Sequence, residues 1–352
     1  MSIPIEATLG MLGDNLRRRH SVLPISRRKA SAWARGLGLP RGGKVVLYTG
    51  QMFQLVPSIN ALSGQLARAE GTWMARYFGF ARRMNRLVNL AGLMARPSSE
   101  EDREYREPLR QIALLLKAAH VEFGYLYEDD LYAGALAYDE GLDDTLRGHA
   151  QTVYARMRAH GVEEVITVDP HTTHLLRSVY PTIVPGYTLK VRTYLEVLAE
   201  REFVPLQSVD SEVTIHDSCL YARSEGVLAQ PRQLLERGGV RIREAELSGR
   251  ATQCCGGPAE MLFPGRAHAV AEKRVQQLQK ASDRVVTLCP LCLANLRRAA
   301  PPGMQISDIS GYLARAYCPM AGGPPGPGPV AVPPGTPAGT ASHGAAIPAP
   351  GP

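Results

Sequence analysis

Five of the six cysteines in this chain fall into three short motifs that could share one metal site. They are Cys219, the adjacent residues Cys254 and Cys255, and the CxxC pair Cys289 and Cys292. A disulfide between neighbouring residues is unfavourable because their Cα atoms lie only about 3.8 Å apart. Thiolates are soft ligands that favour zinc and iron–sulfur clusters. The cysteines therefore predict a thiolate-bound metal site.

The number of cysteines bears on which metal they would hold. Structural zinc takes four ligands, commonly from two CxxC-like pairs. This chain offers one CxxC pair, one adjacent pair and one single cysteine. Adjacent cysteines cannot easily both reach one tetrahedral ion, whereas they can reach two irons of a cluster, or one of them can bridge. We therefore expect an iron–sulfur cluster. Zinc and unreactive buried thiols remain the alternatives.

An internal repeat explains how distant cysteines could meet. Residues 165–177 (VITVDPHTTHLLR) align without gaps with residues 285–297 (VVTLCPLCLANLR), and residues 45–51 align with 213–219. Each aligned segment begins with a β-branched strand that runs into a loop, and helical stretches alternate with these strands. This pattern predicts two pseudo-repeated α/β halves with mainly parallel sheets flanked by helices. Loops after parallel strands gather at one sheet edge, so the cysteines should converge there.

The cysteine motifs resemble the CCG domain found in the B-type subunit of heterodisulfide reductase and in related iron–sulfur oxidoreductases. The matching stretches are HDSC (216–219), CCGGP (254–258) and CPLC (289–292), within a likeness that covers about residues 44–318. The resemblance implies an oxidoreductase subunit that acts on a sulfur compound and binds one [4Fe-4S] cluster, of the noncubane type. By position, its ligands would be Cys219, Cys254, Cys255, Cys289 and Cys292.

Neighbours of the motifs are candidates for supporting roles. Gly256 would let the backbone pass close to the cluster, where a Cβ would collide. His216 and Asp217 are candidates to hydrogen-bond cluster sulfur or to hold the loop. Cys318 is expected to be a small apolar residue near a helix end.

The first half departs from the family pattern because it contains no cysteine. The repeat places Gln51, Asp169 and Thr172 opposite Cys219, Cys289 and Cys292. The first-half counterpart of the adjacent pair Cys254 and Cys255 falls near residues 128–131. A first cluster should therefore be absent. The loop DPHTTH (169–174) could hold zinc or iron through Asp169, His171 and His174. We favour a former cluster loop whose polar residues face a shared cleft. His171 and His216 are the candidate catalytic residues.

Four regions follow from composition. They are a basic N-terminal arm (1–43), a cysteine-free half (44–200) with a helical insertion at about 66–112, a cluster-binding half (201–318), and a Pro/Gly/Ala-rich tail (319–352) expected to be disordered. Residues 1–44 hold nine Lys/Arg and two acidic residues, which equals the net charge of +7 of the chain. The arm would dock on an acidic protein or be a solvated face, and no nucleic-acid module accompanies it. Within the insertion, residues 73–94 would pack in the core or lie on a partner or membrane surface.

The remaining features concern location and partners. No apolar run approaches the roughly 20 residues that span a bilayer, and no secretory signal is evident, so we expect a cytoplasmic protein with reduced thiols. The chain has no ferredoxin-type cysteine run and no flavin or nicotinamide fingerprint, so a redox partner is needed. The resemblance implies a ferredoxin-like subunit with two [4Fe-4S] clusters, similar to the C-type subunit of heterodisulfide reductase. A flavin subunit is a further candidate. Alternative functions are a zinc-binding interaction module and a subunit of a lactate- or glycolate-type dehydrogenase complex.

Overall fold

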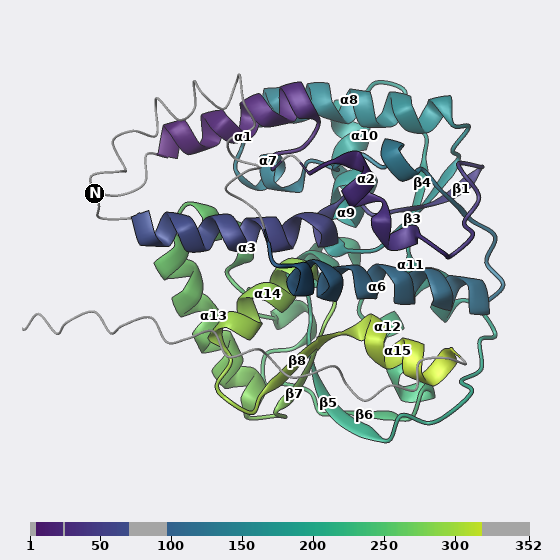
Figure 1. Cartoon of the computed structure of the whole chain (residues 1–352). Helices are drawn as coiled ribbons and strands as arrows, with labels where there is room; N and C mark the ends of the chain where they lie inside the picture. The colour runs from purple at the N-terminus through teal and green to yellow at the C-terminus, as the bar shows by residue number, and fades with distance from the viewer. Residues whose placement is uncertain (1–4, 24, 70–96, 319–352) are drawn as a thin grey trace, which may run out of the picture.

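Short β-branched and apolar runs form two four-stranded sheets in the computed structural model, which describes residues 5–23, 25–69 and 97–318 (Figure 1). All paired strands run parallel. The first sheet has the order β2-β1-β3-β4, with β1 (Val45–Tyr48), β2 (Gly124–Tyr125), β3 (Glu164–Thr167) and β4 (Lys190–Thr193). The second has the order β6-β5-β7-β8, with β5 (Ser211–His216), β6 (Val240–Ile242), β7 (Arg284–Thr287) and β8 (Gln305–Asp308).

The matching strand orders confirm the two related α/β halves. β1 and β3 are neighbours in the first sheet, just as β5 and β7 are in the second. β3 leads into helix α9 and β7 leads into helix α14, and each helix begins with a proline, Pro170 or Pro290. Proline suits the first helical position because it has no N–H to leave unpaired there. The gapless alignment of residues 165–177 with 285–297 therefore pairs structurally equivalent elements.

Helices surround both sheets. In the first half they are α1 (Ile5–Arg19), α2 (Arg27–Ala30), α3 (Met52–Ala69), α6 (Ser99–Ala118), α7 (Ala135–Asp139), α8 (Asp143–Ala159), α9 (Pro170–His174), α10 (Tyr180–Ile183) and α11 (Tyr194–Ala199). In the second half they are α12 (Ala229–Arg237), α13 (Pro264–Gln279), α14 (Pro290–Ala299) and α15 (Ile309–Tyr317). Shorter 3₁₀ turns are η1 (Ala32–Ala34), η3 (Tyr127–Asp129), η6 (Gly249–Ala251) and η7 (Gly257–Met261), and π-helical turns are η4 (Leu175–Val179) and η5 (Tyr221–Glu225).

Helices α3 and α6 join the two halves. They pack on each other, while α3 also contacts α14 and α6 contacts α15, so they lie between the two sheets (Figure 1). Arg298 donates to Asn60 at 3.0 Å and Arg297 pairs with Glu104, which adds polar contacts along this boundary. The two halves therefore share a core.

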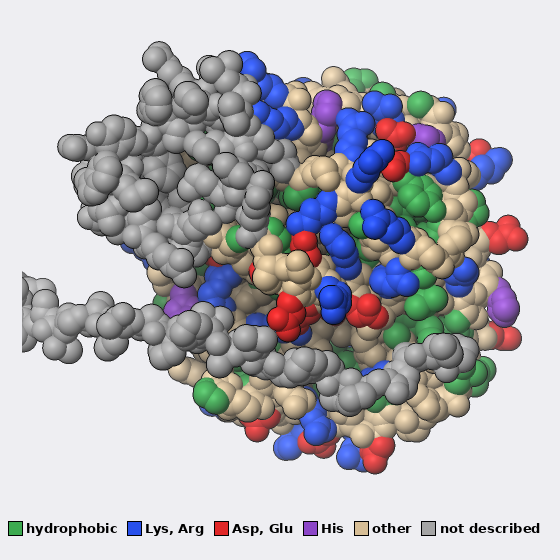
Figure 2. Space-filling model, viewed as in Figure 1, with side chains coloured by type: hydrophobic (Ala, Val, Ile, Leu, Met, Phe, Trp, Pro, Cys, Tyr) green, Lys and Arg blue, Asp and Glu red, His purple; other side chains and the backbone are tan. Residues whose placement is uncertain are grey.

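The basic N-terminal segment is not a detached arm. Leu16 and Trp33 are fully buried in the first half, and α1 packs on α8. Tyr125 of β2 donates its N–H to the Pro40 carbonyl at 2.8 Å and accepts from the Gly42 N–H at 3.0 Å. The segment thus extends the edge of the first sheet. The prediction of an arm was based on charge alone and was wrong, because the apolar residues of the segment pack into the core. Lys and Arg side chains do gather on the face over α2 and α6 (Figure 2).

Two regions defined from the sequence fall partly or wholly outside the described residues. The ends of the expected insertion at 66–112 belong to α3 and α6, but residues 73–94 are outside the described part. The proline-rich tail (319–352) is outside it as well.

Candidate metal centre

Three loops of the second half carry the five cysteines to the carboxyl edge of its sheet. Cys219 follows β5 and precedes η5. Cys254 and Cys255 lie in the loop between η6 and η7. Cys289 is the N-cap residue of α14, and Cys292 lies in the first turn of that helix. The parallel-sheet argument therefore predicted the right edge.

The thiols form a continuous chain of contacts. Cys254 lies within hydrogen-bond contact of both Cys219 and Cys255. The Sγ atoms of Cys255 and Cys292 are 3.2 Å apart, and Cys292 contacts Cys289. Sulfur atoms from positions 219 to 292 thus meet in one place. Cys255, Cys289 and Cys292 are nearly inaccessible, whereas Cys219 and Cys254 are partly exposed.

The electrostatics of these thiols suit a bound cation. Hydrogen bonds from Cys219 and Cys255 lower the pKa of Cys254 to about 2, while the same contact raises the pKa of Cys219 and of Cys255. Burial opposes ionisation of Cys289, but the contact with Cys292 lowers its pKa; the pKa of Cys292 is raised, first by its contact with Cys255. Adjacent negative charges prevent all five thiols from ionising together. Bound metal would remove this obstacle by replacing the protons, so the donor set fits an iron–sulfur cluster.

Two glycines shape the loop around Cys255. Gly256 has a φ of +80°, and a Cβ there would lie 2.5 Å from the Ala267 carbonyl oxygen. This backbone contact with α13 is a packing reason for Gly256 that the sequence did not reveal. A Cβ on Gly257 would lie 3.4 Å from the Cys255 sulfur, so Gly257 keeps space open beside that thiol. The sequence argument missed Gly257, although it adjoins the cysteine motif.

His216 also lies at the cysteine site. A ring nitrogen of this buried residue and the sulfurs of Cys255 and Cys292 all lie within 4.8 Å of one another, and this is the metal-capable group found within the described residues. Its Nδ1 accepts a hydrogen bond from Arg274 Nε at 3.1 Å. Burial, followed by the charge of Arg274, lowers the pKa of His216 to about 3. Arg274 was not predicted, because a helical arginine far along the chain carries no local signal of this contact.

Asp217 holds the first cysteine loop in place. Its carboxylate accepts from Arg232 Nη1 at 2.9 Å and Nη2 at 3.0 Å, and from the Gly249 N–H at 2.6 Å. The Asp217 carbonyl accepts from Thr252, two residues before the cysteine pair. Between the two roles considered for Asp217, these contacts favour loop stabilisation.

His171 brings the first half to the same site. Its Nδ1 lies 3.7 Å from Cys289 Sγ, and its Nε2 lies 3.7 Å from Asp139 Oδ2. Burial opposes protonation, but the neighbouring Cys289 thiolate and Asp139 carboxylate raise the pKa of His171 to about 10. Asp139 at the end of α7 was not predicted, since nothing local in the sequence links it to residue 171.

The three candidate ligands in DPHTTH, which are Asp169, His171 and His174, do not form a metal site of their own. Asp169 caps α9 by accepting from the N–H groups of His171 and Thr172 at 2.9 and 3.0 Å. His174 pairs with Glu225 at 2.7 Å. Two of the three side chains therefore have structural partners, and only His171 faces the cysteines.

Polar side chains occupy the first-half positions equivalent to cluster ligands, and those of Gln51 and Asp169 are hydrogen-bonded. Gln51 Nε2 donates to the Asp130 carbonyl at 2.5 Å, and Thr49 Oγ1 donates to the Asp130 carboxylate at 2.5 Å. Thr172 packs so closely on Gly50 that a Cβ there would lie 2.2 Å from Thr172 Oγ1. These contacts fit a former cluster loop retained for folding.

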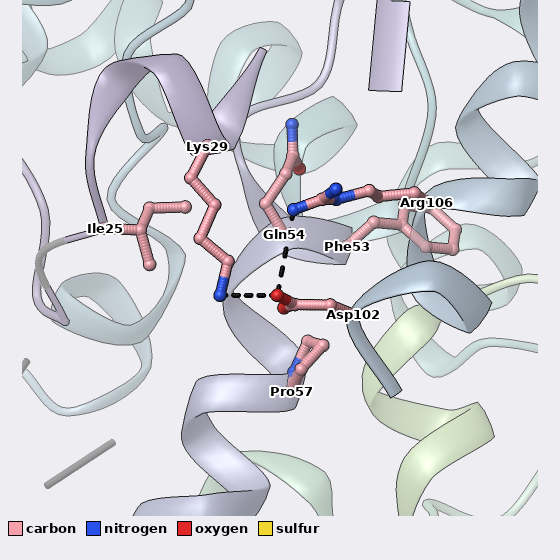
Figure 3. Close-up of a pocket in the computed structure, with 7 residues that line it drawn as sticks. All are labelled: Ile25, Lys29, Phe53, Gln54, Pro57, Asp102 and Arg106. Carbon is pink, nitrogen blue, oxygen red and sulfur yellow. Dashed lines mark ion pairs between the residues drawn. The ribbon is translucent and has the colours of Figure 1, made fainter. Parts of the chain in front are cut away.

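Other features lie apart from this site. Cys318 is buried at the end of α15, as a small apolar residue would be, and burial raises its pKa to about 11. A small pocket on the first half is lined by Phe53, where Asp102 pairs with Lys29 at 2.5 Å and with Arg106 at 3.7 Å (Figure 3). Its lining residues include none of the cysteines. Across the described ranges, no helix is both long and apolar enough to cross a membrane.

Comparison with known proteins agrees with the geometry. Residues 213–297 match the family described as the cysteine-rich domain, CCG. The chain is 27% identical over 229 residues to a probable membrane-anchored ferredoxin of Chromohalobacter salexigens, covering 61% of this chain and 34% of that protein. It is 30% identical over 234 residues to the EtfAB:quinone oxidoreductase of Syntrophomonas wolfei, covering 61% and 32%. It is 26% identical over 217 residues to the D-type subunit of the dihydromethanophenazine:CoB–CoM heterodisulfide reductase of Methanosarcina acetivorans, covering 57% and 53%.

Residues 213–297 of the second half are therefore similar to a cysteine-rich CCG domain, and the chain is similar to iron–sulfur oxidoreductases. Heterodisulfide reductase is among these relatives, as the motifs predicted, but the matches do not distinguish its B-type from its D-type subunit. The aligned part spans about a third of the first two proteins and about half of the third.

Proposed function

We propose that this chain is the cluster-binding subunit of an iron–sulfur oxidoreductase that exchanges electrons between a disulfide or thiol compound and partner iron–sulfur subunits. The meeting of thiols from three loops at one sheet edge is the observation that carries the proposal. Cys219, Cys254, Cys255, Cys289 and Cys292 would hold one [4Fe-4S] cluster, of the noncubane type. When bound, the cluster would supply electron transfer in single steps.

The chemistry of the substrate sets what the site must do. Cleaving a disulfide to two thiols consumes two electrons and two protons, and the electrons would come from a partner. His171 of the first half lies between Cys289 and Asp139, so it is the residue we expect to contact a bound sulfur compound. The partly exposed Cys219 and Cys254 mark the side from which a compound could approach.

A second candidate is an electron relay without a small-molecule substrate. Cys255, Cys289 and Cys292 are at most 3% exposed, which suits a cluster shielded from solvent. Two of the relatives are named as a ferredoxin and as an EtfAB:quinone oxidoreductase, and these names describe electron transfer. A relay would accept electrons from one protein and deliver them to another, with no sulfur compound consumed.

Partners are part of the proposal in either case. A ferredoxin-like subunit with two [4Fe-4S] clusters would deliver electrons, and a flavin subunit could stand beyond it. Placement in the cytoplasm would keep the thiols reduced before cluster assembly.

Anaerobic purification followed by iron, sulfide and EPR analysis tests the proposal. We expect a brown protein with about four irons per chain. Cys255→Ser should lose most of the iron or change the EPR signal, whereas the matched variant Cys318→Ser should retain both. A colourless protein with one zinc would support the interaction-module alternative instead.

Turnover distinguishes the two redox candidates. Chemically reduced protein is mixed with disulfides, including the CoB–CoM heterodisulfide, and thiol release is measured. Release of two thiols per disulfide supports the first candidate. Fast electron exchange with a ferredoxin, without thiol release from any disulfide tried, supports the relay.

A further inference from the structure

Arg274 is a fully buried guanidinium beside the cysteine site, with 0% of its surface exposed. Its Nε donates to His216 Nδ1 at 3.1 Å. Its Nη1 donates to the Leu247 carbonyl at 2.9 Å and to Gln277 Oε1 at 3.1 Å, and its Nη2 donates to Thr252 Oγ1 at 3.5 Å. Every one of these hydrogen-bond partners is uncharged. The helix α13 therefore places a positive charge in the core without a direct counter-charge.

A buried charge of this kind needs compensation, because an unpaired ion in the interior costs several kcal/mol. Among the described residues, no carboxylate forms an ion pair with Arg274. Asp217 is close enough to act on it, but the Asp217 carboxylate is already held in two hydrogen bonds by Arg232. The other group that favours the charged form of Arg274 is Cys292. The cysteine site is thus the remaining place for negative charge, and a thiolate-bound iron–sulfur cluster is an anionic group.

The hydrogen bond from Arg274 also fixes the proton on His216. An arginine side chain can only donate, so His216 Nδ1 must be the acceptor. The single proton of the neutral imidazole then lies on Nε2. Nε2 is buried and has no hydrogen-bond partner among the described residues. A ring that holds its proton on Nε2 and accepts on Nδ1 has no free lone pair for a metal, so His216 is a donor and not a ligand.

We propose that Arg274 and His216 are positioning residues for the cluster, in which Arg274 supplies a buried positive charge and orients His216 so that its Nε2–H donates to cluster or thiolate sulfur. This inference rests on the proposed function, since it requires a cluster at the five cysteines. Positive charge and N–H···S hydrogen bonds stabilise the more negative, reduced state. The pair therefore raises the reduction potential of the cluster.

Potentiometric titration followed by EPR tests the pair in full-length protein purified without oxygen. His216→Leu removes the N–H, and Arg274→Gln removes the charge; both should shift the midpoint potential to more negative values while EPR still detects a cluster. His216→Gln keeps an acceptor for Arg274 and an N–H for sulfur, so its potential should return close to wild type. Arg266→Gln on the exposed side of the same helix is the matched control and should change nothing.

The outcomes separate this inference from the proposed function. Wild-type protein that contains no iron would overturn both the proposed function and this inference. Wild-type protein with a cluster, together with an unshifted potential in His216→Leu, would overturn the inference and leave the proposed function standing. If circular dichroism shows that Arg274→Gln does not fold, the comparison of His216→Leu with His216→Gln still tests the inference. If the role of His216 were purely structural, the glutamine amide in His216→Gln would not restore the midpoint potential.

Discussion

Asp130 is a buried carboxyl group that should make the stability of the protein depend on pH. It accepts hydrogen bonds from Thr49 and, at 2.9 Å, from the Tyr125 hydroxyl, yet burial raises its pKa to about 7. The folded state therefore holds this proton more tightly than the unfolded chain between about pH 4 and pH 7. The free energy of unfolding should fall as pH rises through this window, by about 4 kcal/mol at most.

Asp130→Asn should remove this part of the pH dependence. The variant and the wild type are compared by urea unfolding at pH 5 and pH 8, both kept anaerobic. We expect a smaller loss of stability towards pH 8 in the variant. Asp210→Asn, at an exposed carboxylate, should follow the wild type. If Asp130→Asn and the wild type lose the same free energy of unfolding between pH 5 and pH 8, Asp130 is not the source of this pH dependence.

Residues next to the cysteine motifs could be predicted, and residues that reach the site through tertiary contacts could not. His216 and His171 were candidates because each lies at or shortly after the end of a strand that the repeat identifies. Arg274 and Asp139 come from other helices, and no spacing along the chain encodes their contacts with these histidines. Asp169 and His174 were considered as metal ligands together with His171, because their capping and pairing partners are visible only in the folded chain.

Among the elements, the edge of the first sheet depends on a close approach of two glycines. A Cβ on Gly124 would lie 1.8 Å from the Gly42 carbonyl oxygen, and this backbone oxygen cannot move aside as a flexible side chain can. Gly124→Ala should therefore destabilise the protein by about 3 kcal/mol or more, because the edge must separate. Thermal unfolding measures the change. Gly148→Ala in α8 is the control; nothing lies within 4 Å of its added Cβ, so it should be neutral or stabilise by up to about 1 kcal/mol.

Strands could be predicted where a run of neighbouring residues carried the pattern of a strand. The β-branched runs predicted β1, β3, β5 and β7 and their parallel arrangement. β2 has only two residues and exists because it pairs with β1 and with the chain at Pro40 to Gly42. A strand of two residues has too little sequence pattern to be detected. The segment just after it, near residues 128–131, is the first-half counterpart of Cys254 and Cys255, and without a recognisable strand before it this counterpart could be placed only approximately.

At the scale of the whole molecule, the N-terminal segment is a part of the first half and not an appendage. Deleting residues 1–43 would remove buried Leu16 and Trp33 and the backbone partners of Tyr125. We expect the deletion variant to lose cooperative thermal unfolding, since burying each large apolar side chain contributes about 2 kcal/mol. A deletion variant with the melting curve of the wild type would show that this packing is dispensable.

Docking by the basic face must therefore be tested without removing the segment. Arg27 and Arg28 of α2 are exposed. Lys and Arg side chains gather on the face over this helix (Figure 2). Arg27→Glu with Arg28→Glu should leave the melting curve unchanged and weaken binding to an acidic ferredoxin-like partner, with the largest loss at low ionic strength because salt screens exposed charges. Arg250→Glu, on an exposed turn of the second half, is the matched control. Equal affinities at low salt would show that the partner does not dock on this face and that the face is only a solvated surface.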